Sequence, residues 1–131
     1  MPKIPFAVHH KWFGLITVSL GMFLGALDLS VNVALPAITE SFGSEMSTVQ
    51  WIIILYIGTT TGLQLTIGRL ADTYGLKRFY VLGVGIYTLA VTLIGLSTNF
   101  DIVLGFRIVQ AIGYAMIMAT SPALVAQMFD D

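Results

Sequence analysis

Long apolar runs separated by short polar segments dominate the pattern of residues along this chain. Two of the runs contain no charged residue, and the other two contain one each, Asp28 and Arg107. About 20 apolar residues in a helix cross the hydrocarbon core of a bilayer, so each run is long enough to do so. Helices are expected because lipid offers no hydrogen-bonding partners to backbone groups. The four runs are 12–35, 49–68, 79–98 and 102–129.

The pattern therefore predicts an all-α integral membrane protein with four transmembrane helices and tight connections. Pro36 is expected to end the first helix, because proline has no backbone N–H and clashes with the preceding turn. Glu40 and Glu45 mark the segment after it as exposed to water. The first run is longer than the apolar core of a signal peptide, and no small-x-small cleavage site follows it. The expected helices cover about 12–35, 48–70, 79–98 and 102–128.

Composition supports a membrane protein and argues against other classes. Hydrophobic residues make up 56% of the chain and charged residues only 10%, whereas about a quarter of the residues of soluble domains are charged. Cysteine is absent, which excludes disulfides and thiolate metal sites. His9 and His10 are adjacent and lack further ligands, so no metal site is expected. No phosphate-binding loop or nucleophile–base pair is present, so neither enzyme activity nor a cofactor is expected. The basic segment is too short for nucleic acid.

Basic residues gather on one side of the predicted topology. With four spans, the N-terminus, residues 68–79 and the C-terminus lie on the same side of the membrane. Residues 37–48 and 97–101 lie on the other side and contain no Lys or Arg. The positive-inside rule predicts that both termini are cytoplasmic, in a plasma or inner membrane. The five basic residues of the cytoplasmic side are Lys3, Lys11, Arg69, Lys77 and Arg78.

Two charged residues lie inside the predicted spans. At about 1.5 Å per residue, Asp28 is about 12 Å from the outer end of the first helix, and Arg107 about 9 Å from that of the fourth. An unpaired charge at such depth costs roughly 2.5–3.5 kcal/mol, so the two are expected to pair if their helices are neighbours. The functional interpretation of Asp28 is a carboxylate that carries a proton. The alternative is a polar contact that only holds helices together.

Further polar residues extend this candidate site. Arg107, Gln110 and Tyr114 recur at i, i+3 and i+7, so they share one face of the fourth helix. That face is predicted to line a hydrated cavity, although hydrogen bonds between helices would explain Gln110 and Tyr114 equally well. Asn32 and Tyr56 are weaker candidates for lining the same cavity.

Small residues predict close contacts between helices. Pairs of glycines four apart occur at Gly21 and Gly25 and at Gly58 and Gly62, a spacing that allows backbones to approach. Three alanines along the fourth helix have the same property. They are Ala111, Ala115 and Ala119.

The segment GRLADTYGLKRF (68–79) concentrates charge between two apolar runs. It contains the pattern G-x-x-x-D-x-x-G-x-K, which resembles the signature between the second and third helices of the major facilitator superfamily. Two positions that are usually basic in that signature, 73 and 76, hold Thr and Leu here. The resemblance implies a loop that latches the N-terminal half of the transporter against its C-terminal half. The latch residues are Gly68, Asp72, Gly75 and Lys77.

Three further stretches resemble the fourteen-helix drug:proton antiporters of this superfamily. LDLSVNVALP (27–36) is similar to their first-helix signature, and TVQWIIILYI (48–57) to the start of their second helix. RIVQAIG (107–113) is similar to R-x-x-Q-G-x-G in the fourth helix. The resemblance implies that residues 1–131 are an incomplete N-terminal portion of such a transporter. One departure is that Asp28 and Asn32 are four apart rather than five, which turns Asp28 by about 100°.

The implied function is proton-coupled efflux of drugs or other small, cationic or amphipathic molecules. The implied partners are the bilayer, protons, these substrates and the remaining helices, without which transport is not expected. One alternative is a self-contained four-helix multidrug exporter that acts as an oligomer. Antiparallel dimers of that kind need a weak orientation bias, and the basic residues here show a strong one. A second alternative is a non-transporting membrane fragment that docks onto other membrane proteins.

Overall fold

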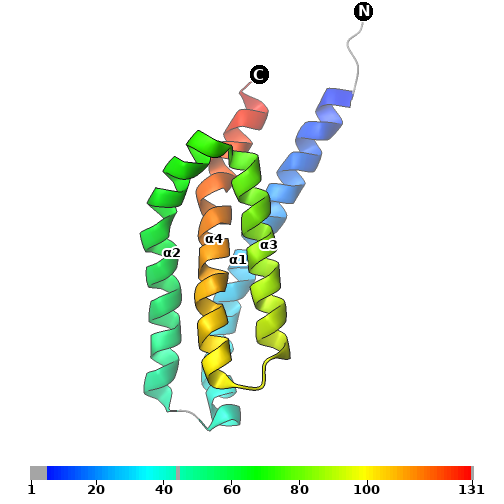
Figure 1. The fold of residues 1–131 in the computed structure, drawn as a ribbon. Helices are drawn as coiled ribbons and strands as arrows, with labels where there is room; N and C mark the ends of the chain where they lie inside the picture. The colour runs from blue at the N-terminus through cyan, green and yellow to red at the C-terminus, as the bar shows by residue number, and fades with distance from the viewer. Residues whose placement is uncertain (1–5, 44, 131) are drawn as a thin grey trace, which may run out of the picture.

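The computed structural model describes residues 6–43 and 45–130, which form four α-helices. Each helix contains a stretch that is long and apolar enough to cross a membrane. The beginning of α1, the end of α4 and the α2–α3 connection lie at one end of the bundle, and the other two connections at the opposite end (Figure 1). The predicted fold class, an all-α membrane protein with four spans, is therefore confirmed. The helices are α1 (Phe6–Phe42), α2 (Met46–Tyr74), α3 (Leu76–Leu96) and α4 (Phe100–Phe129).

The first helix continues past the residue that was expected to end it. Pro36 lies inside α1, which reaches Phe42, so the expectation of a loop after residue 36 was wrong for residues 37–42. Proline removes a single backbone donor, and membrane helices tolerate this loss when neighbouring groups satisfy the freed carbonyl. The helix is also continuous through the four-residue step from Asp28 to Asn32. No bulge interrupts it there.

A single residue, Gly75, joins α2 to α3. Its φ is 111°, a value that residues with a Cβ atom rarely adopt, and its N–H donates to the carbonyl of Ala71 at 2.8 Å. The segment 68–79 was expected to be a loop, but it is helical on both sides of this glycine. Gly68 and Asp72 therefore belong to the end of α2, and Lys77 to the first turn of α3. Polar side chains reach water there without any need for the backbone to leave the helix.

The closest approach between helices joins α3 to α4. α4 packs against all three other helices, and most extensively against α3. A Cβ atom placed on Gly113 would lie 2.7 Å from the backbone nitrogen of Tyr87 and 2.9 Å from the carbonyl oxygen of Gly83. By contrast, a Cβ on Gly58 or Gly62 would meet no described atom within 4 Å. Among the described residues the Gly58–Gly62 pair therefore makes no close contact, and its role in packing stays a prediction.

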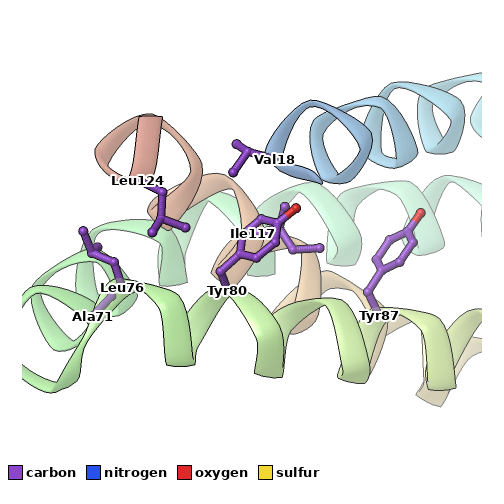
Figure 2. Close-up of a cluster of buried hydrophobic side chains, with 7 residues drawn as sticks. All are labelled: Val18, Ala71, Leu76, Tyr80, Tyr87, Ile117 and Leu124. Carbon is purple, nitrogen blue, oxygen red and sulfur yellow. The ribbon is translucent and has the colours of Figure 1, made fainter. Parts of the chain in front are cut away.

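A buried cluster fills the space between the helices (Figure 2). Within it, Tyr80 and Tyr87 point from α3 toward α1. The Tyr80 hydroxyl donates to the carbonyl of Thr17 at 2.8 Å, and the Tyr87 hydroxyl donates to that of Leu24 at 3.3 Å. The two tyrosines are seven residues apart in α3, and the two acceptor residues are seven apart in α1. The second hydrogen bond therefore lies about two turns along each helix from the first. The cluster comprises Val18, Ala71, Leu76, Tyr80, Tyr87, Ile117 and Leu124.

Candidate functional site

Asp28 of α1 and Arg107 of α4 form an ion pair in the interior of the bundle. The Nη1 atom of Arg107 donates to Oδ1 of Asp28 at 2.8 Å. Asp28 is 4% exposed and Arg107 6%. Both charged side chains are therefore shielded from the outside of the bundle and interact mainly with their protein partners. The two residues are in contact, as their similar depths suggested. The pair balances two charges that would each be costly alone in a membrane.

Gln110 connects both members of this pair. Its Nε2 group donates to Oδ1 and to Oδ2 of Asp28, both at 3.1 Å, while its Oε1 atom accepts from Nη1 of Arg107 at 2.8 Å. Arg107 and Gln110 lie one helical turn apart, which places both side chains on the face of α4 that meets α1. The Asp28 carboxylate therefore accepts hydrogen bonds from a cation and from an amide. We refer to Asp28, Arg107 and Gln110 as the polar triad.

Tyr56 of α2 closes the opposite side of the triad. The guanidinium carbon of Arg107 lies 4.6 Å from the centroid of the Tyr56 ring, a cation–π geometry. Tyr56 is 4% exposed, and within the described part of the chain its hydroxyl is the one buried side-chain polar atom without a hydrogen-bond partner. A buried hydroxyl without a partner is costly. The Tyr56 hydroxyl is therefore a buried hydrogen-bond donor beside the triad that no described group satisfies.

Tyr114 links this region to the glycine pair of α1. Its ring stacks on that of Tyr56, with centroids 6.2 Å apart. A Cβ atom on Gly25 would overlap the Tyr114 ring, and one on Gly21 would overlap the Tyr80 hydroxyl. The Gly21–Gly25 pair thus makes room for tyrosine side chains, and not for the backbone of another helix as predicted. The sequence analysis missed Tyr80 and Tyr87, although their seven-residue spacing places them on one face.

A cavity of about 270 Å³ reaches the triad from the side of α1, α3 and α4. Asp28, Arg107 and Gln110 form the polar part of its wall, and the rest is largely apolar. Tyr56 and Tyr114 do not line it, and the side chain of Asn32 lies outside the described part of the structure. The lining residues are Leu24, Leu27, Asp28, Tyr87, Val91, Ile94, Arg107 and Gln110.

The four residues of the latch signature lie together at the α2–α3 end of the bundle. Asp72, Gly75 and Lys77 are exposed, whereas Gly68 is half-buried. A Cβ atom on Gly68 would meet no described atom within 4 Å. Among the described residues, Asp72 forms no ion pair. The described residues also contain no group of three His, Asp or Glu side chains that could hold a metal ion.

Comparison with known proteins identifies similar sequences of transporters. The chain is 37% identical over 120 residues to the riboflavin transporter RibZ of Clostridioides difficile, covering 91% of this chain and 26% of that protein. It is 35% identical over 118 residues to the methylenomycin A resistance protein of Bacillus subtilis, covering 89% and 25%. It is 36% identical over 118 residues to the multidrug resistance protein Stp of Mycobacterium tuberculosis, covering 89% and 22%.

The chain spans about a quarter of the length of these curated relatives. No solved structure matches it significantly. The sequence pattern of the Major Facilitator Superfamily, a family of transporters and not of enzymes, matches residues 12–131. Together with four apolar helices of membrane-spanning length, this match shows that the chain is a multi-pass membrane protein that belongs to the Major Facilitator Superfamily.

Proposed function

We propose that this chain supplies the proton-binding helices of a proton-coupled efflux transporter, in which Asp28 carries the proton. The observation that supports this most directly is the buried polar triad. Asp28 is a carboxylate deep in an apolar bundle, and Arg107 is the charge that compensates it among the described residues. Intramembrane ionisable groups are expensive and are kept mainly where they serve transport or proton transfer. The substrates we propose are small cationic or amphipathic molecules.

The names of the relatives support efflux of drugs or other small molecules. They include a methylenomycin A resistance protein, a multidrug resistance protein and an efflux pump. One relative is named a riboflavin transporter, which favours, as a second candidate, transport of a single metabolite of similar size. Either function would require the remaining helices of the transporter, which we propose as partners of these four.

The geometry of the triad supports a proposal for how a proton and a cationic substrate exchange. With Asp28 ionised, its carboxylate holds Arg107 and the Gln110 amide by hydrogen bonds. A proton on Asp28 removes the charge that attracts the guanidinium, which weakens this contact and favours a different arrangement of α1 and α4. A cationic substrate that approaches Asp28 competes with the proton for the same carboxylate. Binding of one therefore promotes release of the other.

Replacing Asp28 by asparagine is expected to abolish proton release on substrate binding. Asparagine has nearly the same shape and still accepts from Arg107, but it does not exchange a proton near neutral pH. The measurement is the proton release that substrate induces in the detergent-purified transporter containing these helices. Asp101→Asn makes the same change at an exposed position and should release protons as the parent does.

Release of protons by Asp28→Asn at the parental level would make Asp28 a packing residue. A second outcome would replace the whole proposal. If the purified 131-residue chain alone exported a cationic dye from liposomes in response to a proton gradient, the self-contained four-helix exporter would be favoured instead.

We further propose that both ends of the chain and the α2–α3 connection are cytoplasmic, in a plasma or inner membrane. The distribution of Lys and Arg supports this orientation, and the absence of native cysteines makes it simple to test. Thr98→Cys and Thr73→Cys place exposed thiols at opposite ends of the bundle. A membrane-impermeant maleimide is expected to label position 98 in intact cells, and position 73 only after permeabilisation. The reverse result would invert the topology.

In this orientation the latch signature faces the cytoplasm. Asp72 and Lys77 are exposed there, where a partner helix of the transporter could pair with them. We propose that Gly68, Asp72, Gly75 and Lys77 hold the two halves of the transporter together in one state of the transport cycle.

A further inference from the structure

A second, larger cavity lies far from the triad, at the end of the bundle where α1 begins and α4 ends. Its volume is about 780 Å³, and its walls come from the first turns of α1, the beginning of α3 and the last turns of α4. The beginning of α1 leans away from α3 and α4 (Figure 1). Val18, Tyr80 and Leu124, which line the cavity, belong to the buried cluster shown in Figure 2. Thr17 and Tyr80, which are joined by a hydrogen bond, also line the cavity.

Two lysines line this otherwise apolar space. Lys11 comes from α1 and Lys77 from α3, and His10 lies beside Lys11. Neither lysine side chain forms a hydrogen bond or an ion pair with any described residue. No Asp or Glu is among the described residues that line the cavity. The cavity therefore combines apolar walls with positive charge that the described part of the protein does not compensate.

Both features fit a lipid of one particular class. Lysines near the surface of the cytoplasmic leaflet attract anionic lipid headgroups, with roughly 1 kcal/mol for each basic residue. A space between membrane helices is filled by acyl chains where no side chain fills it, because a void loses its dispersion contacts. A zwitterionic headgroup would fill the same space, but it would leave the two ammonium charges without a net counter-charge.

We propose that this cavity binds one anionic phospholipid, whose phosphate lies between Lys11 and Lys77. One acyl chain then extends along Phe13, Val18 and Leu124 toward Tyr80. This assignment rests on the proposed cytoplasmic orientation of this end of the bundle, and it does not depend on proton-coupled transport. The bound lipid would connect α1 to α3 at the end of the bundle where these helices diverge.

Native mass spectrometry of the purified 131-residue chain tests the headgroup site. Phosphatidylglycerol and phosphatidylcholine with identical acyl chains are added in equal amounts, and the expected result is one retained phosphatidylglycerol. The double variant Lys11→Gln/Lys77→Gln removes two basic residues and should retain roughly thirtyfold less of it. The double variant Arg69→Gln/Arg78→Gln removes the same charge from the same end of the bundle, outside the cavity lining. It should bind as the parent does.

Three results would overturn the headgroup site. Equal loss in the lysine and arginine double variants would mean that only the overall surface charge attracts the lipid. Equal retention of phosphatidylcholine would mean that the lysines do not select the headgroup. Displacement of phosphatidylglycerol by excess inorganic phosphate would show that the site recognises a free anion and not a lipid.

The acyl chain has its own test, which also controls for folding. Val81 lines the cavity, and Val81→Trp should fill it and reduce retention of phosphatidylglycerol. Leu89→Trp adds the same side chain to an exposed position of α3 that does not line the cavity, and should retain the lipid. Both variants are compared at parental helix content, measured by circular dichroism. Unchanged binding in Val81→Trp would overturn the proposed path of the acyl chain.

Discussion

Replacing Arg107 by methionine is expected to destabilise the bundle by about 3–5 kcal/mol, because it leaves a buried carboxylate without its cation. Methionine has a similar length and remains apolar beside the Tyr56 ring, so the variant mainly removes charge. Asp28→Leu should have a comparable cost, since it leaves the guanidinium without its anion. The double variant should cost less than either single change, because no buried charge remains, although Gln110 loses its hydrogen bonds to both residues.

Reversible unfolding of the purified chain in mixed micelles, followed by circular dichroism, measures these differences. The coupling energy is the change in the free energy of unfolding in the double variant minus the sum of the changes in the two single variants. Asp101→Leu and Arg69→Met remove charges of the same kinds from exposed side chains, and each should change stability by less than about 1 kcal/mol. Additive effects of Asp28→Leu and Arg107→Met would show that the ion pair is not energetically coupled.

Hydropathy predicted the existence of the four helices, but not where they end. Apolar runs report which residues can face lipid, and that is a property of side chains. Whether the backbone stays helical beyond the run is a separate question, because polar side chains at the interface are solvated on a helix as well as on a loop. The residues after Pro36 and the residues around Asp72 are helical for this reason. Gly75 ends α2 because its backbone adopts a positive φ.

The sequence predicted the contacts of the triad better than those of the tyrosines around it. Two opposite charges at similar depth in an apolar chain have few other ways to be compensated, so the contact between Asp28 and Arg107 followed from electrostatics. Gln110 followed from helical spacing. Tyrosines such as Tyr56 and Tyr87 fit lipid-facing, interfacial and buried positions alike, so their contacts depend on how the helices cross. The role of Tyr56 in transport stays a prediction.

Close packing illustrates the same limit. The Gly58–Gly62 pair and the Gly113 position all carry small residues, and spacing alone does not tell which helix face meets a neighbour. In the structure, Gly113 faces the backbone of α3, while Gly58 and Gly62 face no described atom within 4 Å. The crossing of α3 and α4 decides which of these glycines meets a neighbouring backbone. A substitution at Gly113 tests this contact directly.

Adding one methyl group at Gly113 is expected to separate α3 from α4. In Gly113→Ala the new Cβ atom would lie 2.7 Å from the nitrogen and 3.0 Å from the Cα atom of Tyr87. Both are backbone atoms, which cannot rotate away as a flexible side chain can, so the helices themselves must move. Overpacking of this kind costs about 1–3 kcal/mol and sometimes more. This cost exceeds the roughly 1 kcal/mol by which alanine is favoured over glycine inside a helix.

A glycine-to-alanine change elsewhere on α4 should stabilise the bundle instead. A Cβ atom on Gly105 would meet no described atom within 4 Å, so Gly105→Ala is expected to raise the free energy of unfolding by up to about 1 kcal/mol. Unfolding in mixed micelles compares the two variants with the parent. Because Tyr87 also bonds to α1 through its hydroxyl, movement of α3 in Gly113→Ala should also loosen α1. Faster hydrogen exchange at the amides around Leu24 would report this loosening. If Gly113→Ala were as stable as Gly105→Ala, α3 and α4 would not be in backbone contact, and the position of Tyr87 beside the triad would have to be revised.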